Sequence, residues 1–186
     1  MPTTKKTRII AFSGSLRKES YTTQLLRAFA KVTPKNVEFE IIDISDLPFI
    51  NQDLEENLPT SVKNLHKAIK SADAVLFATP EYNRSYSPVV KNAIDWGSRP
   101  QGKNAWDGKP AAVIGCSPYS LGGFGAVNHL RQVMLYVNLA TMQQPEFYLS
   151  FADDKMDKDD NITDKETQKF VGDFWKAFLE WTVRFV

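Results

Sequence analysis

Short apolar runs alternate along the chain with segments in which apolar residues recur at helical spacing. The strand-like runs are 9–12, 37–43, 74–78, 111–116 and one within 139–149. The helical segments are 21–32, 61–71, 126–138 and one that closes the chain after the charged connector 153–160. Strands that alternate with helices predict one doubly wound α/β domain over residues 1–186, with a five-stranded parallel sheet between two helical layers.

The composition of each run indicates its place in this sheet. Residues 74–78 are apolar without interruption, as expected of a strand covered by helices on both faces. Residues 37–43 alternate at first between apolar and acidic side chains, which is typical of an edge or one-sided strand. Ser87-Pro88 predicts the start of a helix, and Thr163 with Glu166 predicts a capping box for the closing helix.

The loop between the first strand and the first helix is suited to hold a phosphate group. The first turn of a helix offers unpaired N–H groups and the positive end of its dipole. Ser13, Ser15 and Ser20 add hydroxyl donors, Gly14 permits close approach of the backbone, and Arg17 adds a guanidinium matched to phosphate oxygens. The alternative is an ordinary turn in which Ser20 only caps the helix.

A second polar loop follows the third strand and suits a flat ring. Pro80 stiffens it, Tyr82 offers an aromatic face, and Asn83 offers amide groups for ring nitrogens and carbonyls. Backbone N–H groups near Tyr82 and Asn83 are also expected to stabilise negative charge on such a ring. The alternative is a polar connecting loop with a chance aromatic residue.

A third loop, 116–125, leaves the fourth strand at the same edge and contains three glycines that permit close approach to a ligand. Ligands of open α/β sheets bind at the carboxyl ends of the strands, where these loops meet. A phosphate loop, a planar-ring loop and a glycine loop together predict a mononucleotide with a flat heterocycle, and FMN fits best.

Composition narrows the class of protein. A formal charge of +1 over 186 residues implies no nucleic-acid partner. The single cysteine, Cys116, excludes an internal disulfide framework and suits a reducing compartment. The basic N-terminus precedes too short an apolar run for a signal peptide, and no run approaches the ~20 residues of a membrane span. We therefore expect a cytoplasmic protein with no membrane contact.

Three segments, 14–20, 80–83 and 91–100, together resemble the NADPH-dependent FMN reductase family, in the branch that contains quinone, chromate and azo-dye reductases. The resemblance covers residues 8–149. It implies a flavodoxin-like fold with strand order 2-1-3-4-5, non-covalent FMN, and NADPH or NADH as electron donor. It also implies ping-pong transfer of two electrons to quinones or related acceptors, namely chromate, azo dyes or free flavin.

The resemblance assigns FMN phosphate to Ser15, Arg17 and Ser20, next to Ser13 and Gly14. It assigns the ring to the second loop and to the start of the third: Pro80, Glu81, Tyr82, Asn83 and Ser117. Tyr21-Thr22 depart from the family, whose members often carry an aromatic residue followed by Asn, and Thr22 retains a hydroxyl donor. Arg84 stands where relatives often have a small residue, and either meets the pyridine nucleotide or faces solvent.

The resemblance also implies a homodimer or homotetramer. Four large aromatic residues support this expectation, because one small core has limited room for them: Trp96, Trp106, Phe124 and Tyr136. Burial of these side chains within the monomer is the alternative.

Several functions other than that of a flavin reductase are alternatives for this sequence. A flavodoxin-like electron carrier is disfavoured by Arg17 and the charge of +1, while a flavin-binding scaffold or sensor stays open. A Ser–His–acid hydrolase would use Ser117, but Tyr119 replaces the second glycine of its nucleophile motif, and its base would be His66 or His129. No metal site and no resident dinucleotide are predicted, because an EF-hand glycine and the G-x-G-x-x-G motif are missing.

Overall fold

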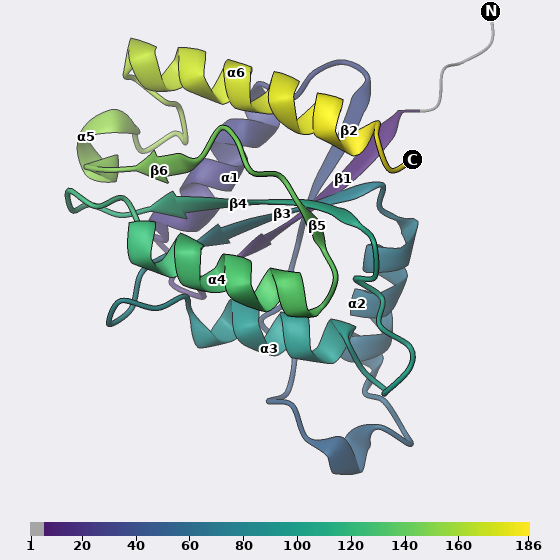
Figure 1. Cartoon of the computed structure of the whole chain (residues 1–186). Helices are drawn as coiled ribbons and strands as arrows, with labels where there is room; N and C mark the ends of the chain where they lie inside the picture. Colours follow the sequence, from purple (N-terminus) through teal and green to yellow (C-terminus); the bar gives the residue numbers. More distant parts are fainter. Residues whose placement is uncertain (1–5) are drawn as a thin grey trace, which may run out of the picture.

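The computed structural model describes residues 6–186, so residues 1–5 of the basic N-terminus lie outside the described part of the chain. A twisted parallel sheet forms the middle layer (Figure 1). Its strands are β1 Thr7–Ser13, β2 Val37–Ile42, β3 Ala74–Thr79, β4 Pro110–Cys116, β5 Ala140–Thr141 and β6 Phe147–Leu149. The order is β2-β1-β3-β4-β5, with β6 also paired to β4, and the strands named here pair in parallel, so the predicted α/β topology is confirmed.

Helices cover both faces of the sheet. The α-helices of residues 6–186 are α1 Tyr21–Lys31, α2 Thr60–Ser71, α3 Pro88–Gly97, α4 Phe124–Tyr136, α5 Ala152–Lys155 and α6 Lys165–Thr182. A short 3-10 turn, η1 Gln52–Leu54, lies in the connection before α2. Figure 1 shows α1 and α6 over one face, and α2, α3 and α4 over the other. No helix of residues 6–186 has the length and apolar character to cross a bilayer.

Alternation along the strands separates two hydrophobic cores. Ile9 and Ala11 of β1 pack in the core beneath α1 and α6. Ile10 and Phe12 point to the other face and pack beneath α2, α3 and α4. Successive side chains of a strand point to opposite faces, so an unbroken apolar strand is what a sheet covered on both sides requires.

Two of the four aromatic residues expected at a subunit interface belong to the core instead. Trp96 and Trp106 are fully buried. Their indole N–H groups donate to backbone carbonyls, that of Trp96 to Pro48 at 2.7 Å and that of Trp106 to Ile94 at 2.8 Å. The monomer therefore buries both rings without leaving a polar atom unpaired, and only Phe124 and Tyr136 stay exposed.

The end of the chain has one feature that the position of Pro145 within 139–149 predicts and one that corrects a sequence-based expectation. The last strand is split into β5 and β6, which both pair with β4 and are separated by the segment that contains Pro145. The prediction of a capping box from Thr163 and Glu166 is wrong. The cap of α6 is Asp164, whose carboxylate accepts the N–H of Thr167 at 2.8 Å and its hydroxyl at 2.6 Å.

Candidate functional site

The carboxyl ends of β1, β3 and β4 bring the three predicted loops together around one pocket of about 290 Å³. Its lining contains most of the predicted site residues: Ser15, Arg17, Ser20, Tyr21, Thr22, Pro80, Glu81, Tyr82 and Ser117. It also contains Cys116, Pro118 and Tyr119, which belong to the predicted third loop but had been assigned no contact with a ligand. Of these, Tyr119 carried a usable signal, because it is an aromatic residue in a glycine-rich loop at the sheet edge.

The loop between β1 and α1 exposes donors on a rigid frame. Ser20 caps α1, since its hydroxyl accepts the N–H of Thr23 at 3.3 Å. The hydroxyl of Ser13 lies 3.1 Å from that of Thr22 and 2.7 Å from that of Thr23. Arg17 is exposed and has no acidic partner among residues 6–186. Ser20 therefore caps α1, and an anionic ligand remains the natural partner for Arg17.

Gly14 lies where the first two loops meet. Its φ is not in the left-handed region, so a strained turn does not require the glycine. A Cβ at this position would lie 2.8 Å from Cδ of Pro80 and 2.9 Å from Oγ of Ser87. The glycine therefore allows the first two loops to touch.

The loop between β3 and α3 folds into a tight hairpin. The N–H of Tyr82 donates to the carbonyl of Ser85 at 2.9 Å, and the reverse bond measures 3.0 Å. The central residues Asn83 and Arg84 both have positive φ, 50° and 67°, as in a type I′ turn. The N–H of Tyr82 is thus already used within the loop, contrary to expectation, whereas that of Asn83 has no acceptor within residues 6–186.

Glu81 is the most enclosed carboxylate of the site, with a side chain that is only 13% exposed. Its Oε2 accepts the backbone N–H of Ala126 in α4 at 3.2 Å. Its Oε1 lies 3.2 Å from Nη1 of Arg84, whose own side chain is 75% exposed. Both carboxylate oxygens therefore bind protein groups, and Arg84 is paired with Glu81 while it faces solvent.

The loop after β4 closes the pocket. The N–H of Ser117 donates to the carbonyl of Leu149 at 3.0 Å, and its hydroxyl accepts the N–H of Tyr119 at 3.1 Å. Burial raises the pKa of the Cys116 thiol. His66 contacts the carbonyl of Trp96 and His129 the hydroxyl of Ser85, so neither histidine is bonded to Ser117 as a hydrolase would need.

Comparison with known proteins decides the family. The model of the family described as NADPH-dependent FMN reductase matches residues 7–154. The chain belongs to the NADPH-dependent FMN reductase family. It is 44% identical to a quinone reductase of Pseudomonas putida, over 90% of both chains. It is 42% identical to an NADPH:quinone oxidoreductase of Arabidopsis thaliana, over 95% of this chain and 92% of the relative.

A solved structure agrees with this membership. The flavoenzyme NAD(P)H:(acceptor) oxidoreductase FerB of Paracoccus denitrificans superimposes with a TM-score of 0.91 at 41% identity. The match covers 96% of this chain and 98% of FerB. A flavodoxin of Pseudomonas aeruginosa, with a TM-score of 0.56 and 13% identity, shares the fold alone. The predicted family and the flavodoxin-like fold are both confirmed.

The donor set of this FMN reductase family member fits FMN. A second hollow of about 310 Å³ lies on the other side of the β1–α1 loop and shares Ser15 and Arg17 with the pocket. The pocket thus combines the phosphate-type donors of the β1–α1 loop with Pro80, Tyr82 and Tyr119 of the other two loops. This combination of cationic and aromatic groups matches a molecule with one phosphate and one flat ring.

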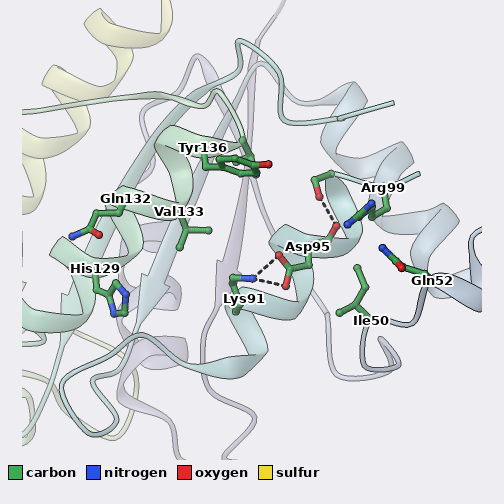
Figure 2. A pocket seen from close by; sticks show the side chains of 11 residues that line it. Ile50, Gln52, Lys91, Asp95, Arg99, His129, Gln132, Val133 and Tyr136 are labelled. Atoms are coloured by element: carbon green, nitrogen blue, oxygen red, sulfur yellow. Dashed lines mark hydrogen bonds and ion pairs between the residues drawn. The ribbon is translucent and has the colours of Figure 1, made fainter. Parts of the chain in front are cut away.

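A larger groove, of about 640 Å³, lies outside this pocket between α3 and α4. Figure 2 shows Lys91 and Asp95 of α3 paired at 2.6 Å, opposite side chains of α4. The α4 side includes His129, Val133 and Tyr136, and Tyr136 is 91% exposed. The groove is open and amphipathic, and no sequence-based expectation had placed a site there.

Proposed function

We propose that this chain is an FMN-dependent oxidoreductase that transfers two electrons from NADPH or NADH to quinones or related acceptors. The observation that carries the proposal is the pocket in which the three loops converge, because its lining includes Arg17, which has no acidic partner within residues 6–186, and the exposed ring of Tyr82. FMN, when bound, supplies the electron-transfer chemistry. Membership of the family and the names of the relatives support the same reaction class.

The β1–α1 loop would hold the phosphate of FMN. Arg17 and the hydroxyls of Ser15 and Ser20 provide charged and neutral donors beside the first turn of α1, where the helix dipole favours an anion. Ser13 and Thr22 support these donors from below, through the hydroxyl contacts that tie the loop to the helix. Gly14 allows the loop to lie against Pro80.

The β3–α3 and β4–α4 loops would hold the ring. Pro80, Tyr82 and Ser117 line the pocket, Asn83 follows Tyr82 in the hairpin turn outside that lining, and one face of the ring would stay open to substrates. The N–H of Asn83 is the backbone donor left to stabilise negative charge on the ring. Donor and acceptor would then use the same face in turn, which is the physical basis of a ping-pong cycle.

Quinones are the acceptors that the relatives named quinone reductase support. Chromate, azo dyes and free flavin accept electrons from the same kind of open site and are the further candidates. A flavodoxin-like carrier and a flavin-binding scaffold or sensor are the alternatives, and both lack direct turnover with a pyridine nucleotide.

The deciding experiment is the absorption spectrum of the purified protein, followed by identification of the released chromophore. FMN, in preference to FAD, is the expected result. Mixing with NADPH in a stopped-flow instrument should bleach the flavin without a separate reductase, and quinone should restore its colour. A flavin that NADPH does not reduce would favour the carrier, and reduction without quinone turnover would favour the sensor.

We also propose that residues 1–186 act as one FMN-binding domain in the cytoplasm, as a homodimer or homotetramer. The groove between α3 and α4 supports self-association, because Tyr136 and Leu135 are highly exposed beside it and its walls carry charges of both signs. Light scattering should report a multiple of the 21.1 kDa chain. Tyr136→Lys should shift this mass toward the monomer, and a monomeric wild type would overturn the assembly.

A further inference from the structure

The carboxylate of Glu81 joins two loops that come from different strands. Oε2 binds the N–H of Ala126 in α4, and Oε1 binds the guanidinium of Arg84 at the tip of its own loop, both at 3.2 Å. The resemblance to the family had assigned Glu81 to direct contact with FMN. In the structure both of its oxygens are already engaged by the protein.

The contact with Ala126 replaces a cap that α4 lacks. The N-cap position of α4 is Gly123, which has no side chain to accept a hydrogen bond, and the first turn contains no acidic residue. Ala126 is the third helical residue, whose N–H a capping side chain normally accepts. Glu81 thus provides from another loop both the acceptor and the negative charge that a helix N-terminus favours.

The helix leaves room for this carboxylate only because residue 125 is glycine. A Cβ on Gly125 would lie 3.0 Å from Oε2 of Glu81 and 3.3 Å from the carbonyl oxygen of Arg84. The carboxylate could move away from such a methyl group, but the movement would stretch its bond to Ala126. Gly125 and Glu81 are therefore sterically coupled.

The other carboxylate oxygen of Glu81, Oε1, pairs with Arg84, which lies in the strained part of the ring loop. Arg84 has a φ of 67°, a left-handed backbone conformation that is unfavourable for a residue other than glycine. Its guanidinium lies on the carboxylate, and the hairpin bonds between Tyr82 and Ser85 close around it. Glu81 thus binds the tip of the hairpin through Oε1 and the first turn of α4 through Oε2.

We propose that Glu81 is a positioning residue that ties the ring loop to the start of α4 and so sets the shape of the pocket, without contacting FMN through its carboxylate. This inference rests on the proposed function, because its effect on ligand affinity presumes that FMN occupies the pocket. Tyr82 and Asn83, which follow directly in the chain, are the residues that it places.

A double-mutant cycle of Glu81→Ala and Gly125→Ala tests the tie. Each single change should weaken FMN binding roughly 3- to 30-fold, the scale of a lost helix cap. Binding of FMN to the apoprotein is measured by quenching of flavin fluorescence, and unfolding of the apoprotein by heat is recorded in parallel. The double variant should be no weaker than the worse single variant, because removal of the carboxylate makes room for the methyl group.

Two further variants serve as controls. Gly172→Ala places a methyl group in open space on α6 and should leave FMN affinity unchanged. Glu81→Gln keeps an amide oxygen that can accept from Ala126. It loses the negative charge, and with it the ion pair to the exposed Arg84, a pair of small worth, and the favourable interaction of the charge with the dipole of α4. It should recover most of the affinity that Glu81→Ala loses.

The failure of this inference is distinguishable from that of the proposed function. Additive losses in the double variant, or a Glu81→Gln variant as weak as Glu81→Ala, would mean that the carboxylate acts on FMN directly. Either result overturns the positioning role while FMN binding stands. A wild-type chain that binds no FMN would instead overturn the proposed function. In that case the tie would hold only if the unfolding temperatures of the two single variants and the double variant, measured on the apoproteins, showed non-additive losses.

Discussion

The backbone N–H of Gly14 donates a hydrogen bond of 2.7 Å to the carbonyl oxygen of Ala78. β1 and β3 pair in register up to Ser13 and Ala78, so this bond continues the parallel ladder past the end of β1. It brings the phosphate loop and the ring loop into contact at their first residues, and Pro80 lies directly against Gly14. The geometry of the pocket therefore begins in the backbone of the sheet.

Gly14→Ala should disturb both loops. The added methyl group would overlap Pro80 and the Ser87 hydroxyl, and overpacking of this kind costs about 1–3 kcal/mol of unfolding free energy. Chemical denaturation measures the loss, and FMN affinity should fall with it. A variant as stable as the wild type would show that the two loops separate without cost.

Arg17→Ala should weaken FMN binding without unfolding the protein. A hydrogen bond to a charged group contributes ~1.5–3 kcal/mol, which corresponds to roughly 10- to 150-fold in affinity. The side chain is exposed and lacks an acidic partner within residues 6–186, so the thermal unfolding temperature of the apoprotein should not change.

Lys18→Ala is the matched control for Arg17. It removes the same charge from the next residue of the same loop, but Lys18 does not line the pocket or the hollow beside it. FMN affinity should fall far less than in Arg17→Ala. Equal losses in the two variants would indicate a diffuse electrostatic effect, and unchanged affinity in Arg17→Ala would place the phosphate elsewhere.

Cys116 should be inert in the folded protein and should make stability fall in alkaline solution. Burial raises the pKa of its thiol above the ordinary value of 9.0, so above about pH 9 the unfolded chain loses this proton while the folded chain keeps it. Unfolding free energy then decreases by up to ~1.4 kcal/mol per pH unit from this group. Cys116→Ala should remove that part of the slope, as denaturation at several pH values can measure.

Local chemistry explains what the sequence predicted well. Ser20 begins α1, and Ser87 with Pro88 begins α3, because a cap and a pre-set φ act within a few residues. The predicted N-cap of α6 was wrong by one position, since Thr163 and Asp164 are adjacent and both are capable of capping. The choice of Asp164 gives two hydrogen bonds from Thr167, which a sequence pattern does not rank.

Long-range contacts explain the rest. Glu81 accepts a hydrogen bond from Ala126, which is far along the chain, and no sequence pattern around either residue predicts this contact. Trp106 was expected at an interface because one small core has limited room for large aromatic residues. Its burial depends on Gly97, which leaves room for the indole against α3, and this contact is not visible in the local sequence. The three loops of the site were predictable because parallel strands end at one edge, whereas the hydrogen bonds between those loops required the folded chain.

Tyr82→Ala should harm the handling of flavin and substrate more than it harms folding. The Tyr82 side chain is 43% exposed at the pocket, so its removal creates no cavity in either core. Its backbone bonds to Ser85 do not involve the ring and should persist. The expected result is faster loss of FMN on dilution, or a raised KM for quinone, with an apoprotein unfolding temperature close to that of the wild type.

The kinetic pattern is the strictest consequence of a site with one open face. Residues of all three loops line one pocket, and in the proposed mode of binding donor and acceptor would share the one face of the ring that these loops leave open. Initial rates with quinone varied at several fixed NADPH concentrations should therefore give parallel double-reciprocal lines, and each substrate should inhibit competitively against the other at high concentration. Intersecting lines would require both substrates to be bound at once, which would overturn the shared face while leaving the assignment of FMN intact.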